Sequence, residues 1–126
     1  MAILARILGD QSPHSAGTSA HSAVRERLLE ELRALDVSAE IQETLARGPG
    51  GRIALVRNVV ARLGAPEGRA LLIASHYDSV GSSPGASDDG AGVAAMLEIA
   101  RALQAHGVDK PVILLFTDGE ELGLVG

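Results

Sequence analysis

The fold is decided by residues 70–116, which read ALLIASHYDSVGSSPGASDDGAGVAAMLEIARALQAHGVDKPVILLF. The unbroken apolar run Ala70–Ser75 is typical of a strand buried on both faces. A loop rich in Gly, Ser, Pro and Asp follows at 80–90, and apolar residues then recur at helical spacing from about Gly92 to Gln104. Pro111–Phe116 is a second apolar strand. Strand, helix and strand in this order predict a crossover between two parallel strands, and therefore an α/β fold.

The residues before this unit predict a helix at Ser19–Leu35 and then a hairpin. The strands of the hairpin are residues 37–41 and Ile53–Leu63, and a Gly-Pro-Gly-Gly turn lies between them. Arg27 and Glu31 are four positions apart, so we expect them to pair on the outer face of the helix.

Composition and charge exclude several classes of protein. The 126 residues include no cysteine, which rules out disulfides and thiolate metal sites within them. The length suits one small domain. The net charge of -5 is uneven, because residues 63–126 carry nine acidic side chains against three basic ones. With one Tyr, one Phe and no basic stripe, the chain does not look like a nucleic-acid-binding protein.

No segment of the sequence is predicted to span a membrane, because its longest apolar runs have only the length of a strand. Residues 1–9 are apolar, but Arg6 interrupts them and no cleavage site follows, so a signal peptide is not predicted. The localisation stays open, since a longer parent protein could be exported or anchored in a membrane.

Polar clusters follow both apolar strands and precede the helix between them. They occupy residues 76–78, 87–90 and 117–121. In open α/β sheets ligands bind beyond the carboxyl ends of the strands, so we expect all three clusters at one edge of the sheet. Taken singly, each has a plain explanation: a hydrogen-bonded His76–Asp78 pair, helix capping by Asp88 or Asp89, and two surface acids at Glu120–Glu121. Their convergence favours a site for a cation, which would offset the repulsion among the carboxylates.

The quoted motifs resemble those of the dizinc aminopeptidases of peptidase family M28. They are His76-Tyr77-Asp78-Ser79, the segment 84–93 around Asp88-Asp89, and the segment 116–123 around Glu120-Glu121. The resemblance runs from about His14 to the last residue. Only 12 positions separate His76 from Asp88, whereas related deacylase-type peptidases have a longer insertion there. The resemblance implies a three-layer α/β/α fold with a mixed, largely parallel sheet of the zinc-exopeptidase kind.

The same resemblance implies a role for each motif residue. His76 ligates one zinc ion and Asp78 orients it, Asp88 bridges two zinc ions, and Glu121 ligates the other. Glu120 is the general base on a metal-bound water. The resemblance also implies a cis peptide bond after Asp88.

Two further metal ligands, an acidic residue and a histidine, are implied after the Glu-Glu pair. Residues 122–126 offer neither, and His14, His21 and His106 are weak substitutes. We therefore expect residues 1–126 to be the N-terminal portion of a single peptidase domain, inactive on its own. The outer edge of the strand Pro111–Phe116 would be unpaired, and copies of the chain could associate through it.

Three hypotheses about function remain. The first is a zinc-dependent aminopeptidase acting on peptides with a free N-terminus. The second is a non-catalytic remnant or binding module on the peptidase scaffold. The third is a zinc-dependent relative that acts as a cyclase or a carboxypeptidase.

Overall fold

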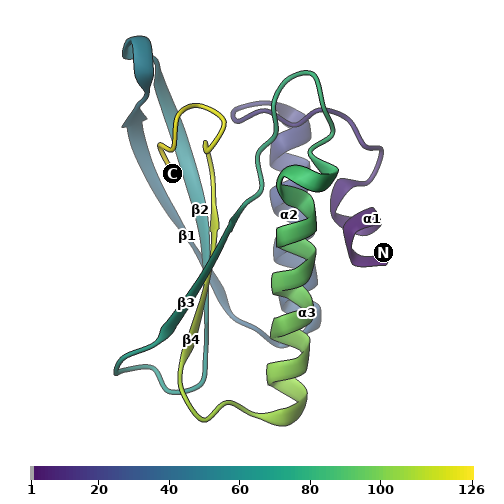
Figure 1. Ribbon diagram of the computed structural model, residues 1–126, viewed down its shortest axis with the longest axis vertical. Helices are drawn as coiled ribbons and strands as arrows, with labels where there is room; N and C mark the ends of the chain where they lie inside the picture. Colours follow the sequence, from purple (N-terminus) through teal and green to yellow (C-terminus); the bar gives the residue numbers. More distant parts are fainter. Residues whose placement is uncertain (1) are drawn as a thin grey trace.

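The computed structural model describes residues 2–126, in which a four-stranded sheet is packed against helices (Figure 1). The helices are α1 (Ala2–Leu8), α2 (Ser19–Ala34) and α3 (Ala91–His106). The strands are β1 (Ala39–Arg47), β2 (Ile53–Leu63), β3 (Leu71–His76) and β4 (Val112–Thr117). Short helical turns lie at η1 (Pro49–Gly51) and η2 (Ala86–Gly90). The predicted order of elements is confirmed from α2 onward.

The β3-α3-β4 unit is the predicted crossover. β3 and β4 pair in parallel, with Leu71 opposite Val112 and His76 opposite Thr117. This register ends the two strands at the same level, so the segments that follow them begin side by side. In Figure 1 both segments, and the start of α3, lie at the same end of the sheet.

The sheet is mixed, in the order β1-β2-β4-β3. The hairpin joins it through β2, which pairs antiparallel with both β1 and β4. In this part of the sheet, therefore, one of the three pairs is parallel. The prediction of an unpaired outer edge at β4 is wrong, because β2 occupies that edge, with Val59 opposite Phe116. Within residues 2–126, the edge strands of the sheet are β1 and β3.

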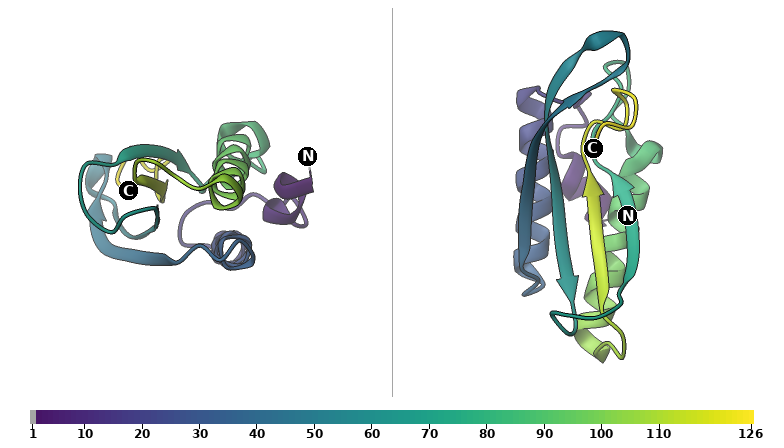
Figure 2. Two further views of the ribbon diagram at one scale, coloured as in Figure 1. Left: turned by 90° about the horizontal axis from the view of Figure 1, so that it is seen from below. Right: turned by 90° about the vertical axis from the view of Figure 1, so that its left-hand side faces the viewer.

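The described helices all lie on one side of the sheet: α2 and α3 pack against its face, and α1 packs against α2 and α3. The right-hand view of Figure 2 shows the other face of the sheet in front of them. The core between helices and sheet includes Leu28 and Leu32 of α2, Leu97 of α3, and Phe116 of β4. The described residues thus supply two of the three expected layers. β3 was expected to be buried on both faces, but Leu71 and Leu72 are 61% and 56% exposed, because β3 is an edge strand and one sheet face carries no helices.

The helix α1 was not predicted from the sequence, and Met1 lies outside the described residues. Helix α1 packs against the rest of the fold through Ile7, which is fully buried. Glu31 was expected to pair with Arg27. In the structure Arg6 of α1 donates to both carboxylate oxygens of Glu31 instead. Arg27 instead donates to the carbonyl of Ile7. None of the helices described has the length and apolar character needed to cross a bilayer.

Candidate metal centre

The imidazole of His76 is held at the end of β3 by its own loop. Its Nδ1–H donates to the carbonyl oxygen of Asp78 at 3.1 Å, which leaves Nε2 free to face other groups. Nε2 lies 3.0 Å from Oδ1 of Asp88 and 4.0 Å from Oε2 of Glu120. Burial alone would lower the pKa of His76, but these carboxylates and the Asp78 carbonyl outweigh it and raise the pKa.

The carboxylate of Asp78 joins the segments that follow β3 and β4, at residues 77–79 and 118–121, which are called the motif loops below. It is fully buried, and its two oxygens accept the backbone N–H groups of Glu120 and Glu121, each at 3.1 Å. It was expected to orient His76 through its side chain. In the structure its carbonyl accepts the ring hydrogen, and its Oδ1 lies 3.5 Å from Nδ1. Because two amides already occupy the carboxylate, Asp78 positions the Glu-Glu pair as well as the imidazole.

The two aspartates before α3 have separate surroundings. The peptide bond between Asp88 and Asp89 is cis, as the resemblance implied. The side chain of Asp88 is 83% exposed and turns toward His76. The carboxylate of Asp89 accepts Gly92 N–H at 3.1 Å and the Ser75 hydroxyl at 2.6 Å, so Asp89 caps the first turn of α3.

The Glu-Glu pair completes a cluster of metal-ligand type. One donor atom each from His76, Glu120 and Glu121 lies within 4.8 Å of the others, and among the described residues this is the group that could hold a metal ion. Partial desolvation, followed by the charges of Asp88 and Glu120, raises the pKa of Glu121. An imidazole nitrogen with several carboxylate oxygens is a donor set that suits a zinc-like cation, so the residues present fit such an ion.

The structure therefore brings together all five residues to which the sequence assigned roles. His76, Glu120 and Glu121 form the cluster, Asp88 touches the imidazole, and Asp78 holds the backbone of the pair. The three other histidines lie outside that cluster.

A contact between two residues near the site was not predicted from the sequence. Asp118 is fully buried next to His21 of α2, and their contact lies between the motif loops and that helix. Asp118 stands in the quoted segment 116–123, directly after an apolar strand, which was an available signal. His21 was considered only as a weak substitute for a missing metal ligand, and its helical pattern gave no signal for a contact with Asp118.

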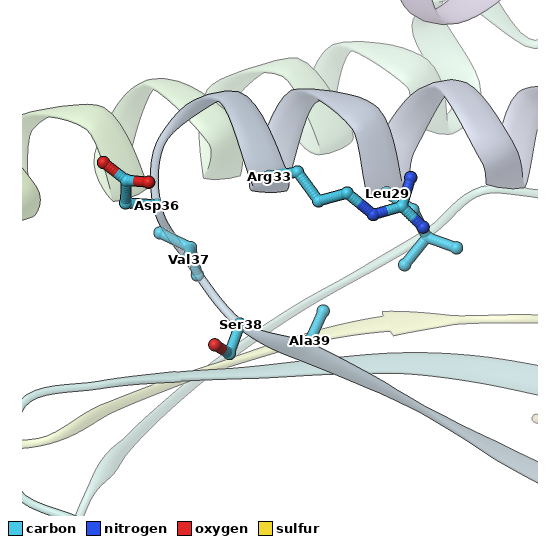
Figure 3. Close-up of a pocket in the computed structure, with 6 residues that line it drawn as sticks. All are labelled: Leu29, Arg33, Asp36, Val37, Ser38 and Ala39. Carbon is cyan, nitrogen blue, oxygen red and sulfur yellow. The ribbon is translucent and has the colours of Figure 1, made fainter.

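Two cavities show where open space lies relative to these side chains. One, of about 380 Å³, is at the turn joining α2 to β1 (Figure 3). None of its six lining residues belongs to the motifs; they are Leu29, Arg33, Asp36, Val37, Ser38 and Ala39. Another, of about 260 Å³, is lined by Asp78, Glu121, Arg52 and neighbouring residues. Of these two cavities, the second borders the candidate metal centre, through Glu121 and Asp78.

Two proteins of known sequence illustrate what this chain is similar to. The Vacuolar membrane protease of Candida albicans is 31% identical over 118 residues, covering 90% of this chain and 14% of that protein. Aminopeptidase YwaD of Bacillus subtilis is 48% identical over 54 residues, covering 43% of this chain and 12% of that protein.

Among solved structures, a glutaminyl cyclase from Porphyromonas gingivalis superposes with a TM-score of 0.86 at 28% identity. A Zn-dependent exopeptidase from Parabacteroides distasonis superposes with a TM-score of 0.84 at 26% identity. The matches cover 99% and 98% of this chain but 46% and 47% of those chains, so the chain spans about half their length. The sequence model of peptidase family M28 matches residues 58–126, and the chain belongs to that family.

Proposed function

We propose that this chain carries part of the active site of a zinc-dependent aminopeptidase. The observation that supports this most directly is the convergence of His76, Glu120 and Glu121 within 4.8 Å, from the ends of two parallel strands. The name of Aminopeptidase YwaD and the Zn-dependent exopeptidase structure support the choice of reaction and of metal.

His76, Asp88 and Glu121 would hold zinc, with Asp88 shared between two ions in the complete site. Zinc supplies a Lewis acid that polarises the scissile carbonyl and activates water. The Nδ1 contact with Asp78 fixes the tautomer of His76 that leaves Nε2 as a ligand atom.

Glu120 would act as the general base. Its carboxylate lies beside the imidazole, 4.0 Å from Nε2, and is partly exposed, so a water and a substrate can reach it. It would take a proton from the attacking water and pass it to the amine that leaves. The hydrogen bond from its N–H to Asp78 fixes where its side chain starts.

We further propose that residues 1–126 are the N-terminal portion of a single peptidase domain, whose substrate is a peptide with a free N-terminus. Two further metal ligands would come from the rest of that domain, so the isolated chain would be inactive. The coverage of about half of each solved relative supports this view.

A second candidate is a zinc-dependent cyclase. The similarity to a solved glutaminyl cyclase favours it, and the site residues described above serve either reaction. A protein purified from its native cells would be assayed with leucine p-nitroanilide and with an N-terminal glutaminyl peptide. Release of p-nitroaniline favours the aminopeptidase, whereas loss of ammonia from the glutaminyl peptide favours the cyclase.

Zinc binding by this chain tests the proposal directly. We expect Zn²⁺ to bind in competition with a chromophoric chelator, and binding to be lost in His76→Ala and in Asp88→Ala. Glu67→Gln, an acid-to-amide change at an exposed position in the loop before β3, is the matched control and should bind as the unchanged chain does. Zinc uptake that is the same in all four proteins would overturn the proposal and leave the non-catalytic scaffold.

A further inference from the structure

A second group of ionisable side chains is buried between the two motif loops and helix α2. It consists of His21 on α2, Tyr77 after β3 and Asp118 after β4. They are 2%, 2% and 0% exposed. None of the three has a role in the proposed reaction, yet burying a carboxylate and an imidazole is costly unless they have partners.

Asp118 is held from three sides. Its Oδ2 accepts the N–H of Arg57 at 2.8 Å, and its own N–H donates to Oδ1 of Asn58 at 2.9 Å. Its Oδ1 lies 2.9 Å from Nε2 of His21. The angle between Nε2 of His21 and Oδ1 of Asp118 does not meet the geometry of a hydrogen bond. Neither of these two atoms has a hydrogen-bond partner within residues 2–126. Each therefore depends on the other for compensation of its burial.

The other side of the His21 ring is defined as well. Nδ1 accepts the N–H of Gly17 at 3.4 Å, which leaves the ring proton on Nε2, facing Asp118. The ring stacks on Tyr77, with centroids 4.9 Å apart and an interplanar angle of 7°. The Tyr77 hydroxyl in turn donates to the carbonyl of Arg57 at 2.7 Å.

His21 therefore touches both motif loops at once. Tyr77 lies between His76 and Asp78, and Asp118 lies two positions before Glu120. We propose that His21 is a positioning residue, whose ring between Tyr77 and Asp118 sets the spacing of the loops that carry the metal ligands. This inference rests on the proposed function, because the spacing matters for a bound metal.

A positioning residue is needed because the proposed metal ligands come from different parts of the chain. His76 and Glu121 arrive from separate strands, and a metal site tolerates only about 0.5 Å of displacement in its donors. Asp78 ties the loops together on the side of the site. The backbone N–H of Tyr77 donates to the carbonyl of Thr117 at 3.0 Å. His21 adds a contact with a third element, α2, whose Leu28 and Leu32 are fully buried in the core.

A purely structural role for His21 makes a different prediction. Removing an ordinary core side chain destabilises the fold but leaves the donors of the folded molecules in place. A positioning residue, when changed, also alters the site in molecules that remain folded. The test therefore compares His21 with Leu32, a fully buried residue on the same helix.

The variants are His21→Phe, which keeps the stacking ring and removes Nε2, and His21→Gln, which keeps a side-chain N–H donor. Asp118→Asn removes the charge while keeping an acceptor, and Leu32→Ala is the control. Each is measured, under conditions where circular dichroism shows it folded, for Zn²⁺ affinity by chelator competition. Amide hydrogen exchange at Glu120 and Glu121 is measured without metal.

We expect His21→Phe to lower the Zn²⁺ affinity by about 10-fold or more. It should also speed exchange at the amides of Glu120 and Glu121 beyond the change in global stability. His21→Gln should recover most of both properties, Asp118→Asn should weaken zinc binding, and Leu32→Ala should leave the affinity as it is.

Two results would overturn the inference: unchanged affinity and exchange in His21→Phe, or equal losses in Leu32→Ala. A failure of the proposed function looks different. In that case the unchanged chain takes up no Zn²⁺, and the exchange of the two amides, which needs no metal, still decides whether His21 positions the loop.

Discussion

The Oδ1 atom of Asp78 accepts the backbone N–H of Glu120 at 3.1 Å, across 42 positions of sequence. The contact joins the segment after β3 to the segment after β4 and is made by a fully buried carboxylate. Hydrogen bonds to a charged acceptor are roughly twice as strong as those between neutral groups. Asp78 is therefore expected to contribute to folding as well as to the site.

Replacing Asp78 with alanine leaves the amides of Glu120 and Glu121 without their acceptor. We expect Asp78→Ala to lower the free energy of unfolding by about 2–4 kcal/mol, measured by urea denaturation without metal. Asp78→Asn keeps an acceptor for one of the two amides and should cost less than Asp78→Ala. If the two variants were equally stable, the carboxylate would not be holding both amides.

Gly92 allows α3 to begin close to β3. A Cβ at this position would lie 2.3 Å from Oδ1 of Asp89 and 2.6 Å from Oγ of Ser75. Alanine is the better helix former by about 1 kcal/mol, but overpacking of this kind costs about 1–3 kcal/mol. We expect Gly92→Ala to be destabilising in urea denaturation.

The matched background for this change is Asp89→Ala, which removes the oxygen nearest to the added methyl group. In that background Gly92→Ala should be less harmful, giving a positive coupling in the double-mutant cycle. Additive effects would mean that the capping carboxylate is not what requires glycine.

The sequence predicted what depends on local pattern. The glycine-rich turn at residues 48–51 predicted a returning strand at Ile53–Leu63, and β2 has these bounds, whereas β1 occupies Ala39–Arg47 instead of the predicted 37–41. The helix Ser19–Ala34 begins at its predicted residue, where Thr18 caps it, and ends within one residue of its predicted bound, because its apolar positions keep a regular spacing. The convergence of His76 with Glu120 was predicted from the strand-helix-strand order, because the ends of two parallel strands lie at the same end of the sheet.

Features set by distant contacts were not predictable in this way. Glu31 pairs with Arg6, 25 positions away, although Arg27 stands at the favourable spacing within its own helix. Which strand becomes the edge depends on where the hairpin inserts, and no short-range pattern records that. The contact of His21 with Asp118 likewise joins two segments that only the assembled fold brings together.

The exposed edge strand β3 leads us to expect that the isolated chain self-associates at high concentration. Leu71 and Leu72 are more than half exposed, beside backbone groups that have no strand partner on that side in the described residues. We expect the chain to self-associate, and Leu72→Lys to shift it toward monomer in analytical ultracentrifugation. Leu45→Lys, on the other edge strand β1, is the control. A shift with Leu45→Lys alone would place the association at β1.

The Arg6–Glu31 pair and the side chain of Ile7 both hold α1 to the rest of the fold. The pair is largely exposed on the Arg6 side, where solvent screens it, whereas Ile7 is buried. We expect Ile7→Ala to lower the free energy of unfolding by about 2–4 kcal/mol in urea. Arg6→Gln should have a much smaller effect, and one that disappears at high salt. A larger loss from Arg6→Gln would reverse this ranking.

His14 predicts how stability depends on pH. Burial lowers the pKa of His14 from the usual value of 6.5 and outweighs the hydrogen bond from Nδ1 to the carbonyl of Ser12 at 3.1 Å, which favours the protonated ring. The unfolded chain therefore binds a proton at a higher pH than the folded chain does. The contribution of neutral His14 is fully present above about pH 6.5 and is lost as the pH falls through the lowered folded value.

We expect the free energy of unfolding to fall below about pH 6.5 by up to about 1.4 kcal/mol per pH unit from this residue. Urea titrations between about pH 7.5 and pH 5 would measure the slope. His14→Gln should flatten it, whereas His106→Gln, at an exposed position at the end of α3, should not. Equal slopes in His14→Gln and in the unchanged chain would show that another group causes the acid sensitivity.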